Sequence, residues 1–221
     1  KYYLYLTKNV LNFKTFYFNQ IKALINMNSH FINDIIQNRR SVFPYQYNGS
    51  DVSNEIIQDL LNNANMAPTH KLTQPWRFKV LQKKAKNKLG DFLSELYFIS
   101  TDPKSFSKFK QNKIKEKCLL SSAIIVICMQ RDLNSSVPEW EEIASTSMAV
   151  QNMWLTCTAN NVGRYWSSPK SIEKIGNFIN LSIGERCLGF MYLGNYNSIE
   201  NTTSKRDSIN SKVEWIDSFD R

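Results

Sequence analysis

A run of seven uncharged apolar residues, Ala123–Met129 (AIIVICM), constrains the fold of this chain more than any other segment. The run has the length of a strand, is rich in β-branched residues, and lacks the polar alternation of a half-exposed strand. It therefore predicts a strand that is buried on both faces. No stretch approaches the roughly 18 uncharged apolar residues of a membrane-spanning helix, so we expect no transmembrane segment.

The other segments alternate between helical and strand patterns without strict strand–helix–strand repetition. Helices are predicted over residues 30–38, 53–65, 83–99, 103–117, 136–160 and 168–178, and further strands over residues 76–81, 164–167 and 187–193. This pattern predicts an α+β fold in which helices flank a mixed or mainly antiparallel central sheet. The glycines do not form a G-x-G-x-x-G pattern after a strand, which disfavours a Rossmann fold.

The last two predicted helices have recognisable boundaries. Ser136 and Ser168 are predicted to cap their N-termini, and Gly163 to end the longer one. The side chains of the longer helix that the pattern makes available to the core are Ala144, Met148, Gln151, Met153, Leu155 and Ala159.

The chain has 221 residues, of which 42% are hydrophobic and 21% charged, a composition that fits one globular domain. Its first 26 residues contain four lysines and no acidic residue. On a helix these lysines would form a basic stripe, suited to a membrane interface or a targeting segment. We favour the simpler interpretation that residues 1–26 are an N-terminal extension, of upstream or non-native sequence, and that residues 27–221 form a single domain.

The net charge of +9 is compatible with nucleic acid, an anionic membrane or an anionic small molecule as a partner. Because four of these charges belong to the first 26 residues, the domain itself is only moderately basic, and we expect no nucleic-acid partner. The four cysteines form no C-x-x-C pair and there are only two histidines, so we expect no metal site. We interpret the cysteines as reduced thiols of a cytoplasmic protein.

Three segments could hold a ligand. The first, Arg39-Arg40-Ser41, follows the predicted helix over residues 30–38. Two guanidinium groups and a hydroxyl suit a phosphate or an electron-rich heterocycle, because arginine offers planar paired donors. The alternative is that the arginines only complement the dipole at the C-terminus of the helix.

The second segment, Ala67–Trp76, is a loop fixed by two prolines that places His70 at the entrance to a strand. The third, Gly163–Pro169, would deliver Ser167 and Ser168 to the start of a helix, where backbone N–H groups point outward. Each segment taken alone could equally be structural, the second as a turn and the third as an ordinary helix cap.

No set of acid, base and nucleophile with a recognised spacing is present, since the G-x-S-x-G elbow and the Walker loop are both absent. Glu139, Glu141 and Glu142 stand at a predicted helix start, where acids are expected on electrostatic grounds. This absence fits an enzyme whose cofactor supplies the chemistry. We therefore predict no catalytic side chain.

The order and spacing of these segments resemble the nitroreductase family over about residues 29–194. That family opens with an Arg-Arg-Ser motif after a short helix, followed by Ala-Pro-Ser/Thr/Asp and by Gln-Pro-Trp at the first core strand. The matching positions are Arg39–Ser41, Ala67–Thr69 and Gln74–Trp76, with the Gly163–Ser168 turn and the Leu188–Gly194 strand. Val137–Glu141 and His70-Lys71 resemble the compact bacterial branch of the family in particular.

The resemblance implies an obligate homodimer with two FMN sites at its interface. Arg39, Arg40 and Ser41 would bind the phosphate, ribityl chain and ring edge of FMN, and His70 would reach FMN across to the partner subunit. Trp166, Ser167 and Ser168 would line the flavin from the other side, and Lys205 or Arg206 would add a charge near the phosphate. The implied reaction is ping-pong. NAD(P)H gives hydride to the flavin and leaves, and a nitroaromatic, quinone or similar conjugated acceptor takes the electrons.

Three positions depart from the family pattern. Met66, Leu72 and Ser167 stand where many relatives have Arg, Asn and Arg, which leaves the nicotinamide preference and the finer FMN contacts open. Two alternative functions also stay open. One is a specialised flavoenzyme of the same fold, such as a dehalogenase, a dehydrogenase or a flavin-modifying enzyme, and the other is a non-catalytic basic binding module.

Overall fold

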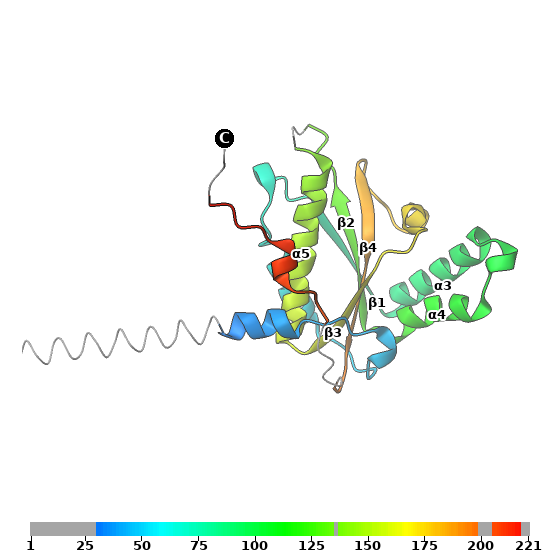
Figure 1. Cartoon of the computed structure of the whole chain (residues 1–221). Helices are drawn as coiled ribbons and strands as arrows, with labels where there is room; N and C mark the ends of the chain where they lie inside the picture. The colour runs from blue at the N-terminus through cyan, green and yellow to red at the C-terminus, as the bar shows by residue number, and fades with distance from the viewer. Residues whose placement is uncertain (1–29, 135–136, 199–204, 218–221) are drawn as a thin grey trace, which may run out of the picture.

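The computed structural model describes residues 30–134, 137–198 and 205–217 (Figure 1). At its centre is an antiparallel sheet with the strand order β1-β2-β4-β3. The strands are β1 (Trp76–Gln82), β2 (Ala123–Gln130), β3 (Val162–Ser167) and β4 (Glu185–Asn195). The predicted α+β class and the antiparallel sheet are confirmed.

Strand β2 lies inside the sheet, and every residue of its apolar run is fully buried. Ala123, Ile125 and Ile127 belong to one core, whereas the alternating residues Ile124 and Val126 belong to the other. The run is apolar throughout because each face of the sheet is covered by helices. Burial of each large aliphatic side chain contributes about 1.5–3 kcal/mol.

Two pairs of helices form the outer layers. Helices α2 (Asn54–Ala64) and α5 (Glu139–Ala159) cover one face, and α3 (Lys83–Ser100) and α4 (Lys108–Leu120) cover the other, where they form a hairpin that projects from the body (Figure 1). A helix also spans residues 30–38. The short 3-10 helices are η1 (Pro44–Gln46), η2 (His70–Leu72), η3 (Pro103–Ser105), η4 (Ile172–Asn177) and η5 (Ile209–Lys212).

Several predicted boundaries are wrong. Helix α4 begins at Lys108, after η3 and an extended link, and not at residue 103. Gly163 does not end α5, because it lies inside β3; the turn between them uses Asn161, whose φ is +52°. Ser168 caps no helix, because the next helix is η4, with Ser171 at its N-cap. Ser136 lies outside the described residues, and the N-cap of α5 is Pro138.

The core-facing side of α5 was predicted only in part, since Met153 is buried and Ala144 and Leu155 are half-buried. Met148 and Gln151 are exposed, and the buried side consists mainly of small residues such as Ser145 and Ala149. Apolar side chains occur on both sides of α5, so helical periodicity alone does not distinguish them. Small residues allow α5 to approach the sheet closely, which leaves the larger Met148 on the outside.

The extension predicted at residues 1–26 lies outside the described residues and stays a prediction. Within the segments that the structure describes, no helix is both long enough and apolar enough to cross a membrane. All four cysteines are buried and free.

Candidate functional site

The Arg39–Ser41 motif is held beside the edge strand β3. The Val42 amide donates a hydrogen bond to the Arg164 carbonyl at 3.0 Å, so the motif enters along that strand. Trp154 of α5 fixes it from the other side, because its Nε1 donates to the Arg40 carbonyl at 3.1 Å. The Arg39 guanidinium lies 4.9 Å from the centroid of the same indole ring. The fold therefore positions both the backbone and a side chain of the motif.

Tyr47 secures the segment that follows the motif. Its ring packs on Gly163 and Gly194, which pair across β3 and β4. A Cβ atom at these glycines would lie 2.6 Å and 2.3 Å from ring atoms, so no other residue fits at either position. The Tyr47 hydroxyl donates to the Tyr192 carbonyl at 2.9 Å and lies 3.1 Å from the Val42 carbonyl.

Positive charge gathers at the motif. Burial lowers the pKa of Arg39, and the nearby guanidinium groups of Arg206 and Arg40 lower it further. Burial likewise lowers the pKa of Arg164, to which Arg39 adds a repulsive contribution. In the part of the chain that the structure describes, neither Arg39 nor Arg206 forms an ion pair with a carboxylate. Such a cluster attracts an anion.

The third predicted segment, Trp166–Ser168, lies at the end of β3. Ser167 is half-buried and Ser168 is exposed. The Trp166 indole packs over Gly189 of β4, where a Cβ atom would lie 2.0 Å from Nε1. This Nε1 is buried and has no hydrogen-bond partner among the described residues.

The structure brings the first and third segments to the same strand. Val42 lies beside Arg164, and Ser167 follows three residues later, which is about 10 Å along a strand. Arg39–Ser41 and Trp166–Ser168 can therefore contact one extended ligand.

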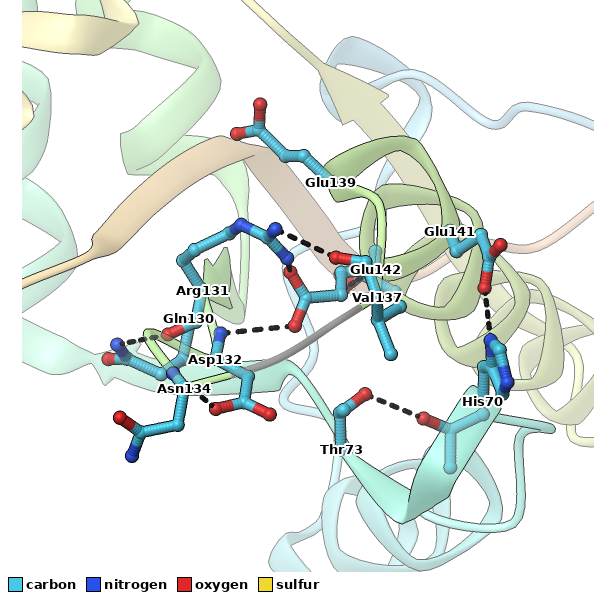
Figure 2. Close-up of polar contacts among 12 residues, drawn as sticks. His70, Thr73, Gln130, Arg131, Asp132, Asn134, Val137, Glu139, Glu141 and Glu142 are labelled. Carbon is cyan, nitrogen blue, oxygen red and sulfur yellow. Dashed lines mark hydrogen bonds and ion pairs between the residues drawn. The ribbon is translucent and has the colours of Figure 1, made fainter.

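His70 does not join these two segments within one chain. Its Nδ1 lies 2.5 Å from Oε2 of Glu141, in the first turn of α5 (Figure 2). Trp154, which holds the Arg39 motif, comes thirteen residues later on the same helix. At 1.5 Å per residue, about 20 Å separates the two levels of α5. Glu141 was interpreted from the sequence only as a helix-start acid, and its contact with His70 was missed.

The loop that presents His70 has an unusual backbone. Lys71, Leu72 and Gln74 adopt positive φ angles of 50°, 54° and 43°, a conformation that costs other residues than glycine about 1–3 kcal/mol each. Thr69 stabilises the loop, because its hydroxyl accepts a hydrogen bond from the Gln74 amide at 3.1 Å. Strain of this kind is commonly retained where a loop binds a ligand.

The departures from the family pattern at Met66 and Leu72 lie in and next to this loop. Both side chains are 77% exposed. They therefore make little contribution to the core of this chain.

A buried ion pair supports the same end of α5. Arg131 pairs with Glu142, a fully buried carboxylate that also accepts a hydrogen bond from the Asp132 amide at 3.1 Å (Figure 2). Arg131 donates in addition to the Val137 carbonyl at 2.7 Å. The contacts tie the loop after β2 to the start of α5. They place Glu141, one residue before Glu142, where it can meet His70.

The described segments contain no group of three or more His, Cys, Asp or Glu side chains that could hold a metal ion. The fold and the site together define an α+β protein whose edge strand, β3, adjoins an anion-attracting arginine motif. The nitroreductase family model matches residues 36–195, which include all three predicted ligand-binding segments but not Lys205 or Arg206. The chain belongs to the nitroreductase family.

Individual relatives agree with this membership. The chain is 25% identical over 167 residues to YfhC of Bacillus subtilis (strain 168), which is named as an NAD(P)H nitroreductase; the match spans 74% of this chain and 83% of that protein. A nitroreductase-like family protein from Bacillus cereus superposes with a TM-score of 0.70 at 26% identity, covering 85% of this chain and 96% of the other.

A more distant structure shares the fold. The FMN-dependent nitroreductase NfnB from Mycobacterium smegmatis, solved in complex with NADPH, superposes with a TM-score of 0.66 at 13% identity. The superposition covers 83% of this chain and 97% of NfnB.

Proposed function

We propose that this protein is an FMN-dependent oxidoreductase that takes hydride from NAD(P)H and reduces nitroaromatic, quinone or similar conjugated acceptors by a ping-pong mechanism. Family membership and the name of the Bacillus subtilis relative support the reaction class. NfnB, which shares the fold, is FMN-dependent and was solved with NADPH.

The observation that supports the cofactor most directly is the gathering of arginines at the motif, where Arg39 and Arg206 form no ion pair with a carboxylate within the described residues. Arg40 and Arg206 lie close enough to Arg39 for their charges to lower its pKa. A phosphate monoester with about two negative charges relieves this repulsion and accepts paired guanidinium bonds. Ser41 would add a hydroxyl donor beside them. These donors fit the FMN phosphate.

The wall opposite the arginines fits the flavin ring. Trp166, Ser167 and Ser168 occupy the end of β3, about 10 Å from the strand position that anchors the motif. The Trp166 Nε1 next to this wall is buried without a hydrogen-bond partner among the described residues. The residues would hold the ring edge by backbone and hydroxyl contacts.

When bound, FMN supplies the redox chemistry by accepting a hydride and passing electrons to the acceptor. The side chains then have three tasks, which are to bind the phosphate, to orient the ring and to exclude water. None of these tasks requires a catalytic acid, base or nucleophile, in agreement with the absence of such a set from the sequence.

The active form that we propose is a homodimer with FMN at its interface. Within one chain, about 20 Å of α5 separates His70 from the level of Arg39. Met148 lies midway between Glu141 and Trp154 and is exposed on α5. If two α5 helices cross antiparallel near Met148, the partner subunit's His70 approaches the level of Arg39, and each flavin site receives residues from both chains.

Exposed apolar side chains support a covering partner at this surface. Trp140 on α5 is 67% exposed, and Phe31 and Ile36 of the helix over residues 30–38 are 62% and 50% exposed. A groove of about 300 Å³ runs between that helix and the end of α5, with Ile32 and Leu155 in its walls. A second copy of the chain would remove these side chains from water.

The direct test is the colour and the redox behaviour of the purified protein. We expect about one FMN per subunit, bleaching of the flavin spectrum by NADH or NADPH without oxygen, and recovery of the spectrum with a nitroaromatic or a quinone. A colourless preparation that takes up no added FMN would contradict the proposal. Flavin that neither nicotinamide bleaches would favour the specialised flavoenzyme instead. The cytoplasmic location stays a prediction.

A further inference from the structure

A second concentration of positive charge lies on the opposite face of the sheet from Arg39. Residues 83–120, which contain the α3–α4 hairpin, have ten lysines and four acidic residues. This excess of six positive charges is larger than the net charge of residues 27–221, so the rest of the domain is slightly acidic. The hairpin projects from the body on the side away from α5 (Figure 1).

A cavity of about 570 Å³ lies where this hairpin meets the segment over residues 169–174 and the sheet. Its volume falls within the range of small-molecule sites in proteins, about 300–1,000 Å³. The floor contains apolar and aromatic side chains, among them Leu93, Ile114 and Tyr192. Such a floor suits the flat or apolar body of a ligand.

Lysines from two separate parts of the chain line the same cavity. Lys110 and Lys117 come from α4, and Lys170 and Lys174 come from the segment before and within η4. None of the four forms an ion pair with a carboxylate within the described part of the chain. Glu173 is the only acidic side chain in the lining.

Two further lysines on α4 behave differently. Lys113 pairs with Glu116 at 2.7 Å, and Lys115 pairs with Asp91 at 2.5 Å. The cavity-lining Lys110 and Lys117 instead lie over aromatic rings, at 5.2 Å from the Tyr97 centroid and 5.5 Å from the Tyr165 centroid. Helix α4 thus carries two lysines that pair with carboxylates and two cavity-lining lysines without such a pair among the described residues, while its first lysine, Lys108, donates to Gln111 Oε1 at 2.9 Å.

We propose that this cavity binds a phosphorylated small molecule of about nucleotide size, with the phosphate among the four lysines and a flat or apolar body on the floor. Lysine is a common phosphate ligand, and the single carboxylate in the lining, that of Glu173, cannot balance the charge of four lysines. The sheet separates this cavity from Arg39, because Arg39 contacts Trp154 on the α5 side. The cavity therefore lies apart from the arginine motif, and it adjoins the proposed flavin wall at Ser167.

The test is calorimetric titration of the full chain, loaded with FMN where it binds FMN, with AMP and with uncharged adenosine. We expect AMP to bind at least about tenfold more tightly than adenosine, and its affinity to fall with rising salt. The double variant Lys117→Gln/Lys174→Gln should weaken AMP at least about tenfold. The Arg39→Ala variant should bind AMP as the wild type does.

The matched control is Lys113→Gln/Lys115→Gln, which removes the same charge from the same helix but outside the cavity. We expect this control to bind AMP within about twofold of the wild type. Equal loss in both double variants would mean general attraction to a basic hairpin and would overturn the proposal. Equal binding of AMP and adenosine, or no binding of AMP, would also overturn the proposal. These outcomes differ from failure of the flavin function, which is measured by colour and bleaching.

Discussion

Arg39 is the residue on which the proposed phosphate site depends most directly. Its guanidinium lies over the Trp154 ring, a cation–π contact that positions it before any ligand binds, and near two further arginines. A fixed donor loses little conformational entropy on binding. Arg40 is held by hydrogen bonds to the backbone instead. Its side chain donates to the Arg39 carbonyl at 3.0 Å, and its own backbone carbonyl accepts a hydrogen bond from the Trp154 indole.

We expect Arg39→Ala to weaken FMN binding by about 1.5–3 kcal/mol, the range for a hydrogen bond to a charged group. Fluorescence titration of the apoprotein with FMN measures the change. Arg186→Ala is the control, because Arg186 forms only an exposed pair with Glu139 at 3.0 Å and should change binding by less than about 0.5 kcal/mol. Unchanged FMN affinity in Arg39→Ala would remove this residue from the site.

The burial of the four free cysteines leads to a prediction about their reactivity. Burial raises the pKa of Cys118 to about 11 and that of Cys157 to about 12. The reactive thiolate is therefore scarce at neutral pH in both, and Cys128 and Cys187 are also buried. We expect a thiol reagent at pH 8 to label neither Cys118 nor Cys157 within minutes in the native protein and to label both after unfolding in denaturant. Rapid labelling of either cysteine in the native protein would contradict the buried arrangement.

Helix α5 organises both ends of the candidate site. Its first turn meets His70 through Glu141, and its later turns hold the Arg39 motif through Trp154. The helix is fixed to the sheet by a small-residue face and at its start by the buried Glu142. The spacing between the two halves of the site is thus a property of one rigid element.

We expect Glu142→Gln to destabilise the fold by roughly 2–4 kcal/mol, because Arg131 would keep its charge at the edge of the core without a counter-charge. Denaturant unfolding monitored by circular dichroism measures the loss. Glu139→Gln, in the same turn but in an exposed pair, should cost less than about 1 kcal/mol. Similar losses of unfolding free energy in both variants would contradict the expectation that the buried pair is worth more than the exposed one.

Sequence patterns predicted the elements that have one clear periodicity. Strand β2 is buried on both faces as its composition indicates, and Ser53, where a helix was predicted to begin, is the N-cap of α2 and accepts a hydrogen bond from the Ile56 amide. The helical pattern did not identify the full buried face of α5, because apolar residues occur on two sides of that helix. It also placed a helix cap wrongly at Ser168, because a Ser-Pro pair occurs in more than one local structure.

The site was predicted only in part for a related reason. The Arg39–Ser41 and Trp166–Ser168 segments were identified by their motifs, and the structure brings them to one strand. Tyr47, Trp154 and Glu141 were missed, because their contacts join residues far apart in the sequence and leave no local pattern. Such contacts are visible only in three dimensions.

At the scale of the whole molecule, the separation of His70 from Arg39 makes the dimer testable. If each flavin site takes Arg39 from one chain and His70 from the other, a heterodimer of Arg39→Ala and His70→Ala subunits contains one intact site. Each variant alone has none. Random pairing makes about half of the dimers mixed, so we expect the co-refolded mixture to regain about a quarter of wild-type activity.

Steady-state nitroaromatic reduction measures this recovery. Mixing Arg39→Ala with the double variant Arg39→Ala/His70→Ala is the control, because no pairing of these chains restores a site. Recovery that does not exceed the average of the two separate variants would contradict a shared site.

The packing of Tyr47 on Gly163 and Gly194 has a consequence for how this family can diverge. The ring occupies the space that side chains at both glycines would need, so the three positions are not free to change one at a time. A relative with a side chain at either glycine position must have a smaller residue in place of Tyr47, together with another way to hold the chain after the arginine motif. Aligned relatives with a side chain at either glycine position should therefore also differ at the Tyr47 position, and a library that randomises only Gly163 or only Gly194 should return almost exclusively glycine.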